Sequence, residues 1–405
     1  MKKLIYSLAF VFIVCCTLKI DNCMSQWVQI SNGIGASQTI ESFASSENYI
    51  FAGTYGVYVS TNNGSNWTQT SLNNEAVKAL VVSGSNIFAG TNNGIYRSTN
   101  KGNSWTQFAF SGVEILSIAF SGNYILAGTV NYGMYLSTNN GNNWNQTNLN
   151  EGNITSIVLS GNNIFAGKSS DYPIYYGGVF RSTDNGYTWT WTSLQHIYVT
   201  SIAVTGNNIF AGVEVSGVYS STNDGNNWTQ TGLNNKNVYS LATIENNIFA
   251  GTYQYGVYLS KDNGTNWVQK NQGFNLIPSV HALLIANNYI FAGTSGQSVW
   301  RRDLSEITGI QNISTEIPSQ FSLSQNYPNP FNPTTVINFQ LSVAGQVVLK
   351  VYDVMGREVQ TLVNESLKPG TYEASFDGSQ LTSGVYFYKL SAGDFSETKK
   401  MLMVK

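Results

Sequence analysis

The sequence predicts an all-β protein: a seven-bladed β-propeller with N-terminal strand closure, followed by a small β-sandwich. Two observations support this fold class. An apolar unit recurs seven times along the chain, and the unit contains no stretch of helical period. The composition agrees, since 13% of the residues are aromatic and only 10% are charged, as is typical of short strands joined by tight turns. At 405 residues the chain also exceeds one ordinary core.

Residues 1–25 are predicted to be a signal peptide. The basic start Lys2–Lys3 precedes an apolar run, Leu4–Cys16, that is too short for a comfortable membrane span, and Ser25 is a small residue at a plausible cleavage point. All three cysteines lie in this segment, so we expect no disulfide and no thiolate metal site in the mature chain. Lipid anchoring is the minor alternative, because neither Cys15 nor Cys23 follows the small residues of a lipoprotein signal.

The repeat is marked by the tripeptide Phe-Ala-Gly or a close variant. Successive copies are 37 to 45 residues apart, a spacing shared by propeller blades and helical solenoids, so the local pattern must decide between them. The copies end at Gly53, Gly90, Gly128, Gly167, Gly212, Gly251 and Gly293.

The second unit has the pattern of four short strands. Val77–Val82, a turn at Ser83–Asn86 and Ile87–Gly90 predict two buried strands and their hairpin. After further turns, Ile95–Ser98 and Ser104–Gln107 complete the unit. Four-stranded sheets repeated radially are the plan of a propeller, which leaves few exposed edges.

The two ends of the repeat array are complementary. Six units end in a tryptophan-bearing strand, whereas the seventh stops after Ser298–Arg302 without one. The segment Gln26–Ile30 matches such a strand and has no unit before it. We therefore expect the N-terminal strand to complete the seventh blade of a propeller that spans residues 26–305.

Six third hairpins share the pattern Ser-x-Asp/Asn-x-Gly-x-x-Trp. The Asp or Asn side chain can accept backbone N–H bonds across the turn, Gly supplies a positive φ, and Trp covers the hairpin from the core side. The pattern resembles the Asp-box, or bacterial neuraminidase, repeat, which implies a structural role for these residues. They are Ser60, Asn62, Gly64, Trp67; Ser98, Asn100, Gly102, Trp105; Ser137, Asn139, Gly141, Trp144; Ser182, Asp184, Gly186, Trp189; Ser221, Asn223, Gly225, Trp228; and Ser260, Asp262, Gly264, Trp267.

The Asp-box family includes sialidases, xyloglucan-cleaving glycosidases, sortilin-type receptors and photosystem II assembly factors. A sialidase site would imply three arginines with a Tyr/Glu pair, and that set is not recognisable here. Arg97 and Arg181 precede boxes at equivalent positions in two blades, which indicates a repeated structural role on outer strands. The remaining propeller arginines are Arg301 and Arg302.

Few other residues are candidates for a catalytic or metal-binding role. Asp171, Glu214 and Glu114 could supply the two opposed carboxylates of a glycosidase, although no motif selects them. His196 and His281, the only histidines, lie near the starts of inner strands without readable partners, so we interpret them as structural. We predict no catalytic residue, no metal site and no cofactor. Turn chemistry accounts for Asp184, Asp224 and Asp262.

The C-terminal segment carries a different pattern. Alternating strands broken by Pro-Gly and Asp-Gly turns predict a small sandwich. Its successive motifs resemble the type A sorting domain of the type IX secretion system, which implies an immunoglobulin-like β-sandwich. The motifs are Phe321–Phe339 (FSLSQNYPNPFNPTTVINF), Val347–Arg357 (VVLKVYDVMGR), Leu367–Thr371 (LKPGT), Gly384–Leu390 (GVYFYKL) and Lys399–Lys405 (KKMLMVK).

The resemblance implies that residues 321–405 carry the propeller across the outer membrane of a Gram-negative bacterium. In that family the domain is usually cut off, and the passenger is released or attached to surface glycolipid. We expect a secreted or cell-surface protein, the secretion machinery as a partner, and a linker at residues 306–320. An ordinary adhesive sandwich module is the alternative interpretation of the tail.

One face of the predicted propeller is rich in tyrosine. If the first strand of each blade is innermost, the loops between second and third strands share a face with the connections between blades. Tyrosine combines a flat apolar area with a hydroxyl, which suits sugar rings or a protein surface, although any single ring could merely pack between loops. The longest insertion, Lys168–Gly178, is in the fourth blade. The predicted ligand-binding residues are Tyr55, Tyr132, Tyr172, Tyr175, Tyr176, Tyr253 and Tyr255.

The charge distribution limits the classes of partner that the protein can bind. From Gln26 to Ile310, ten Lys and Arg are scattered among thirteen Asp and Glu, so we expect no nucleic-acid partner. No apolar run after residue 25 is long enough to span a bilayer. We favour a non-enzymatic module that binds a protein or a polysaccharide, because no catalytic constellation is legible. The alternatives are an extracellular glycoside hydrolase of an Asp-box type and a surface scaffold without a small ligand.

Overall fold

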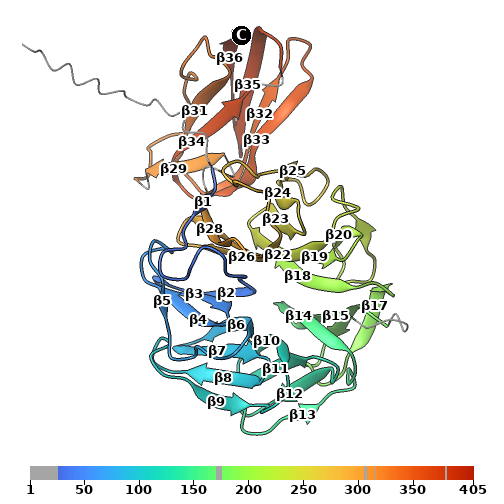
Figure 1. Cartoon of the computed structure of the whole chain (residues 1–405). Coiled ribbons are helices and arrows are strands. Elements are labelled where there is room, and N and C mark those ends of the chain that lie inside the picture. Colours follow the sequence, from blue (N-terminus) through green and yellow to red (C-terminus); the bar gives the residue numbers. More distant parts are fainter. Residues whose placement is uncertain (1–25, 170–175, 305–306, 308, 315, 379–380) are drawn as a thin grey trace, which may run out of the picture.

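The computed structural model describes residues 26–169, 176–304, 307, 309–314, 316–378 and 381–405. In this part of the chain, seven four-stranded sheets form a ring of blades, and two further four-stranded sheets form a sandwich at its rim (Figure 1). Every strand pair is antiparallel. The predicted all-β fold class is confirmed.

In the first six blades the strands run outward from the centre of the ring in chain order, and in the seventh blade β1 lies outside β26, β27 and β28. The first strands of neighbouring blades pack side by side, and the last of them packs against the first, so the ring is closed. These innermost strands are β2 (Ser42–Ser46), β6 (Val77–Ser83), β10 (Ile115–Ser121), β14 (Asn153–Ser160), β18 (Val199–Thr205), β22 (Val238–Ile244) and β26 (Val280–Ala286).

The second strands carry the Phe-Ala-Gly repeat: β3 (Tyr49–Thr54), β7 (Asn86–Thr91), β11 (Tyr124–Thr129), β15 (Asn163–Ser169), β19 (Asn208–Val213), β23 (Asn247–Thr252) and β27 (Tyr289–Thr294). The third strands are β4 (Gly56–Ser60), β8 (Gly94–Ser98), β12 (Met134–Ser137), β16 (Gly178–Ser182), β20 (Gly217–Ser221), β24 (Gly256–Ser260) and β28 (Ser298–Asp303). The outer strands are β5 (Thr68–Gln69), β9 (Thr106–Ala109), β13 (Asn145–Gln146), β17 (Thr190–Gln195), β21 (Thr229–Gln230), β25 (Val268–Gln269) and, in the seventh blade, β1 (Val28–Gln29).

The N-terminal strand closes the seventh blade, as predicted. In β1, Val28 pairs with Arg301 and Gln29 with Trp300 of β28. The neighbouring Trp27 is buried, its indole N–H donates to the Lys270 carbonyl at 2.6 Å, and its ring stacks on that of Phe274. Residues from the two ends of the repeat array therefore share one sheet, which ties the ring shut.

The Phe-Ala-Gly repeat is explained by packing between blades. A Cβ atom on Gly53 would lie 2.7 Å from Cγ1 of Val77 on the next blade, closer than real Cβ contacts allow. In each of the other six blades, a Cβ atom on the corresponding glycine would likewise come too close to a Val or Ile of the neighbouring blade. The Phe before it fills the layer between blades, as Phe51 does without any exposed surface. Glycine is therefore required for the close approach of the backbones, and Phe supplies the core.

The six Ser-x-Asp/Asn-x-Gly-x-x-Trp turns, here called box hairpins, share one hydrogen-bond pattern. In the first, Gly64 N donates to Ser60 Oγ at 2.8 Å, and Asn66 N donates to Asn62 Oδ1 at 2.9 Å. The same two bonds occur in the other five, at 2.8 to 2.9 Å. The box glycines have φ between 79° and 90°, a left-handed conformation that favours glycine.

The box tryptophans differ from the prediction in position. Each lies immediately before its outer strand rather than within it. Trp67 is almost fully buried and its indole N–H donates to the Ile30 carbonyl at 2.8 Å, whereas Trp105 is half-buried and donates to Thr70 Oγ1 of the preceding blade. Four of the indoles thus bond to the preceding blade, those of Trp67, Trp105, Trp228 and Trp267. The indoles of Trp144 and Trp189 bond to a carbonyl of their own box hairpin.

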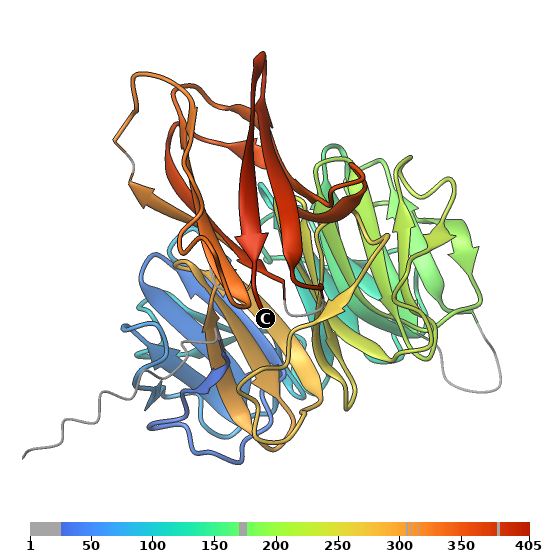
Figure 2. The same cartoon turned by 90° about the horizontal axis from the view of Figure 1, so that it is seen from above.

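The sandwich consists of two sheets with the strand orders β29-β34-β31-β30 and β33-β32-β35-β36. Their facing side chains form one core, which includes Leu349, Phe339 and Phe376. The strands are β29 (Ile310–Ser314), β30 (Ser322–Leu323), β31 (Thr334–Leu341), β32 (Gly345–Tyr352), β33 (Glu358–Leu367), β34 (Gly370–Asp377), β35 (Gly384–Ala392) and β36 (Phe395–Met403). Figure 2 shows the sandwich, in orange to red, standing beside the blades.

Part of the predicted linker belongs to the sandwich sheet. β29, which lies within residues 306–320, pairs with β34. The sandwich also touches the propeller, since the Asn246 side chain donates to the Asn364 carbonyl at 2.8 Å. Within the described residues, no helix combines the length and apolarity needed to cross a bilayer.

Candidate functional site

The two faces of the propeller are built from different turns. On one face, which we call the loop face, the loops between second and third strands bond to the connections between blades. For example, Val130 N donates to the Glu114 carbonyl and Tyr253 N to the Asn237 carbonyl. The opposite face, which we call the box face, carries the box hairpins and the hairpins between first and second strands. Loops of irregular sequence therefore gather on one face and the repeated turns on the other.

The described tyrosines of the predicted site all lie in loops of the loop face, with 41% to 64% of their surface exposed. The residues Tyr172 and Tyr175 lie outside the described part of the chain, as does Asp171. The described ones are Tyr55, Tyr132, Tyr176, Tyr253 and Tyr255.

Several of these rings are anchored by neighbours. Tyr253 lies 5.8 Å from the ring of Tyr239, measured between centroids, and Tyr176 lies 6.0 Å from that of Trp191. The Lys236 ammonium sits 3.9 Å from the centroid of Tyr255. Each ring keeps an exposed surface while one side is held, which reduces the conformational entropy lost when a ligand binds.

Sequence reasoning missed further exposed groups on the same face. Tyr198 lies directly before β18, Val215 lies in the loop between β19 and β20, and Leu276 and Ile277 lie in the connection to β26. Val215, Leu276 and Ile277 each expose more than half of their surface. These residues could have been found in the sequence, because each is an aliphatic residue in a predicted loop, where polar residues are usual. The loop face thus gains apolar area over the fifth to seventh blades.

The inner strands bring seven side chains to equivalent positions near the loop face. In six blades the ladder between first and second strands shifts register at one residue near the start of the inner strand, and such a bulge re-aims the side chain. In the first blade Glu41 occupies this position, since its N–H donates to the Gly53 carbonyl at the start of the ladder. We call this set the mouth ring. Its members are Glu41, Lys78, Leu116, Thr155, Thr200, Tyr239 and His281.

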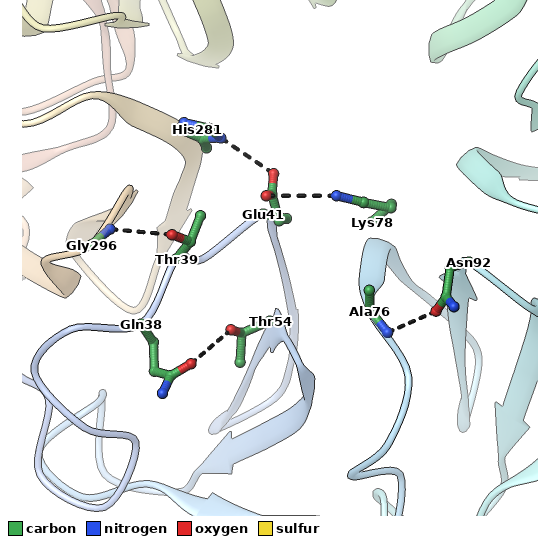
Figure 3. Close-up of polar contacts among 9 residues, drawn as sticks. All are labelled: Gln38, Thr39, Glu41, Thr54, Ala76, Lys78, Asn92, His281 and Gly296. Carbon is green, nitrogen blue, oxygen red and sulfur yellow. Dashed lines mark hydrogen bonds and ion pairs between the residues drawn. The ribbon is translucent and has the colours of Figure 1, made fainter.

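Two members of the mouth ring, His281 and Lys78, converge on the carboxylate of a third, Glu41 (Figure 3). His281 Nδ1 lies 3.2 Å from Glu41 Oε2, and Lys78 Nζ lies 3.7 Å from Glu41 Oε1. Since an ionised carboxylate only accepts hydrogen bonds, Nδ1 is the donor. The hydrogen bond from His281 lowers the pKa of Glu41, as does the charge of Lys78, against the opposing effect of burial. The carboxylate thus stays ionised between two nitrogen groups.

His281 therefore has a partner that its local sequence did not reveal. The two residues of the pair are 240 positions apart, and closure of the ring brings them together. On its other side the imidazole meets the Tyr239 ring edge-on, with 4.9 Å between centroids. Burial raises the pKa of Tyr239, and the nearby Glu214 carboxylate adds to this effect. His196, by contrast, is exposed and packs against Trp191.

The remaining candidates for chemistry serve the scaffold in part. Arg181 donates to the Asp224 carbonyl in the next box hairpin at 2.9 Å, and Arg301 donates to the Asn63 carbonyl of the first. Arg97 lies 5.1 Å from the ring centroid of Phe108. These contacts hold neighbouring strands and blades together. Among the described residues, no group of three or more His, Cys, Asp and Glu is arranged to hold a metal ion.

Comparison with known families identifies the C-terminal domain. The family model described as "Secretion system C-terminal sorting domain" matches residues 325–405. This chain is a β-propeller protein with a type IX secretion sorting domain. The sorting domain of this propeller protein implies interaction with the secretion machinery and indicates a secreted or cell-surface location in a Gram-negative bacterium. A second model, "DUF6242 beta propeller domain", matches residues 15–114 and 49–158.

Solved structures support the fold of the propeller protein. YCF48 from Cyanidioschyzon merolae is 14% identical with a TM-score of 0.57, and the match covers 70% of this chain and 99% of that one. A structure of YCF48 bound to D1 peptide is 15% identical with a TM-score of 0.54, covering 69% and 95%. An ancestral GH74 enzyme is 17% identical with a TM-score of 0.54, covering 93% of this chain and 63% of that one. A search among curated proteins gave no match.

Proposed function

We propose that the propeller is a non-enzymatic binding module that recognises an extracellular polysaccharide or protein through its loop face. The sorting domain takes this module to the cell surface or the medium, where such ligands are met. Residues of the loop face are positioned by the rigid blades, and this is the usual arrangement of binding loops on a scaffold.

One observation carries the proposal: the exposed tyrosines of the propeller are concentrated on the loop face. Among the described propeller residues with large exposed rings, Tyr187 lies in a box hairpin and the other six lie in loops of the loop face. Exposed aromatic area that is not needed for the core marks interaction sites. The aliphatic Leu276 and Val215 extend the same surface.

The structural neighbours support a binding role for such a fold. YCF48, whose propeller resembles this one, has a structure with a bound D1 peptide. At 15% identity this likeness concerns the fold, so the ligand of the present propeller has to be found by experiment. Function in propellers depends on the site rather than on the fold.

The test is a binding screen of the chain from Gln26 to Lys405 on a glycan array and on a peptide array. The variant Tyr253→Ala/Tyr255→Ala is compared with Tyr187→Ala, which removes an equally exposed ring from the box face. We expect selective binding that falls at least tenfold in the double variant and is unchanged in the control. Binding that survives the double variant, or that falls equally in both, would contradict the proposal.

A further inference from the structure

The mouth ring is chemically asymmetric. Over the third to fifth blades it consists of Leu116, Thr155 and Thr200, and both threonine hydroxyls are used by the backbone. Thr155 Oγ1, for example, donates to the Val199 carbonyl of the next blade at 2.7 Å. Over the sixth, seventh, first and second blades the same position carries Tyr, His, Glu and Lys. Four adjacent blades thus depart from the apolar and threonine pattern together.

The polar half of the ring keeps hydrogen-bonding capacity. Lys78 Nζ is 3.7 Å from its carboxylate partner, which is beyond hydrogen-bond range, and it has no other partner among the described residues. The Nδ1 bond of His281 fixes the ring and leaves Nε2 without a hydrogen-bond partner in the same described part of the chain. Glu41 retains lone pairs, since each oxygen can accept more than one bond. The cluster therefore offers donors and acceptors side by side.

The cluster is less exposed than the loops. The side chains of Glu41, Lys78 and His281 are 27% to 32% exposed, whereas Tyr55 in a loop of the same face is 64% exposed. Tyr239 and Tyr253, whose rings are in contact, give an aromatic path from the loops down to His281. A partly buried cluster of charged groups beside aromatic rings suits a small polyhydroxylated unit better than a broad protein surface.

We propose that Glu41, Lys78, His281 and Tyr239 form a saccharide subsite at the loop-face ends of the inner strands. The carboxylate accepts from one sugar hydroxyl, the ammonium and Nε2 bond to its neighbours, and the phenol ring packs against the carbon face of the sugar. This inference rests on the proposed function and names the class of ligand for it. The loop tyrosines then contact the rest of the glycan.

The propeller supplies a matched control for the key substitutions. Glu47 and Lys101 form a pair at 3.4 Å on the box face, and Glu47 follows the other end of the same strand, β2, that Glu41 precedes. Glu41→Gln is therefore compared with Glu47→Gln, and Lys78→Met with Lys101→Met. Glutamine retains the size of glutamate, and the melting temperature of each variant shows whether it is folded.

The experiment uses the chain from Gln26 to Lys405 on the same glycan and peptide arrays, followed by titration of the best glycan. We expect Glu41→Gln and Lys78→Met each to weaken binding of that glycan at least tenfold, with melting temperatures close to those of their controls. The box-face variants should bind like the wild type. This result supports the subsite.

The other outcomes overturn the subsite and separate it from the proposed function. If a glycan binds through the loop tyrosines and Glu41→Gln binds it equally well, the subsite is wrong while the loop-face module stands. If only peptides bind, and do so through those tyrosines, the ligand class is wrong and the module again stands. If neither array yields binding, both proposals fail.

Discussion

The box face and the loop face of this propeller are built by the same blades, but the box face repeats one set of contacts whereas the loop face varies from blade to blade. On the box face the same hydrogen bonds recur in six hairpins. On the loop face, equivalent positions carry different chemistry, as in the mouth ring, where Glu41 and Leu116 occupy the same place in two blades. Repetition indicates what every blade needs in order to pack. Departure from the repeat indicates where the molecule does something that packing does not require.

The largest expected difference between the faces is in stability. Trp67→Ala on the box face removes a buried ring and its bond to the Ile30 carbonyl, so the free energy of unfolding should fall by about 3 to 5 kcal/mol. Tyr55→Ala on the loop face removes an exposed ring and should change it by less than about 0.5 kcal/mol. Urea unfolding midpoints of the two variants measure both values. Equal losses of unfolding free energy in the two variants would contradict the view that the box face stabilises the fold and the loop face does not.

A smaller loss is expected from a single box hydrogen-bond group. Ser60→Ala leaves Gly64 N, which is buried, without its acceptor, and this should cost about 1 to 3 kcal/mol. The matched variant is Ser65→Ala in the same hairpin, where the serine is exposed. The difference between the two urea midpoints isolates the box contact. If both variants unfold at the wild-type midpoint, the repeated bonds are not what stabilises the hairpins.

The smallest effect concerns pH at the mouth ring. The folded-state pKa of Glu41 is lowered, so this carboxylate contributes stability that is present above its unfolded pKa and is lost as the pH falls through the folded value. Wild type should therefore lose stability between about pH 5 and pH 3, and Glu41→Gln should lose less, by at most about 1 kcal/mol. Urea midpoints at the two pH values measure this. A Glu41→Gln variant that loses as much as the wild type would show that the His281 contact does not form.

The fold could be predicted because each repeated residue answers a contact that recurs in every blade. Gly53 and its equivalents are needed wherever the next blade places a Val or Ile, so the same glycine recurs seven times in the sequence. Ring closure followed from counting strands at the two ends of the array. The box tryptophans were misplaced by one residue because a Trp beside polar alternation has the pattern of a strand, while the indoles of Trp67 and Trp105 bond to the preceding blade.

The site could be predicted only in part. Loop tyrosines are visible in the sequence because they follow the repeated tripeptide at short spacing. The contact between Glu41 and His281 was not visible, since it depends on the closure of the ring and each residue has ordinary neighbours in the sequence. Aligning the blades on the residue twelve positions before each Phe-Ala-Gly glycine would have revealed the mouth ring. Whether β29 belongs to a linker or to the sandwich was likewise decided by pairing with a distant strand.

The most direct test of the division between the faces is hydrogen–deuterium exchange of the chain from Gln26 to Lys405 with and without the ligand that the arrays select. The account predicts slower exchange on ligand binding in the loops around Tyr55 and Tyr253 and at the starts of β2 and β26, with no change in the box hairpins. Protection confined to the box hairpins, such as the one from Ser60 to Trp67, would contradict it.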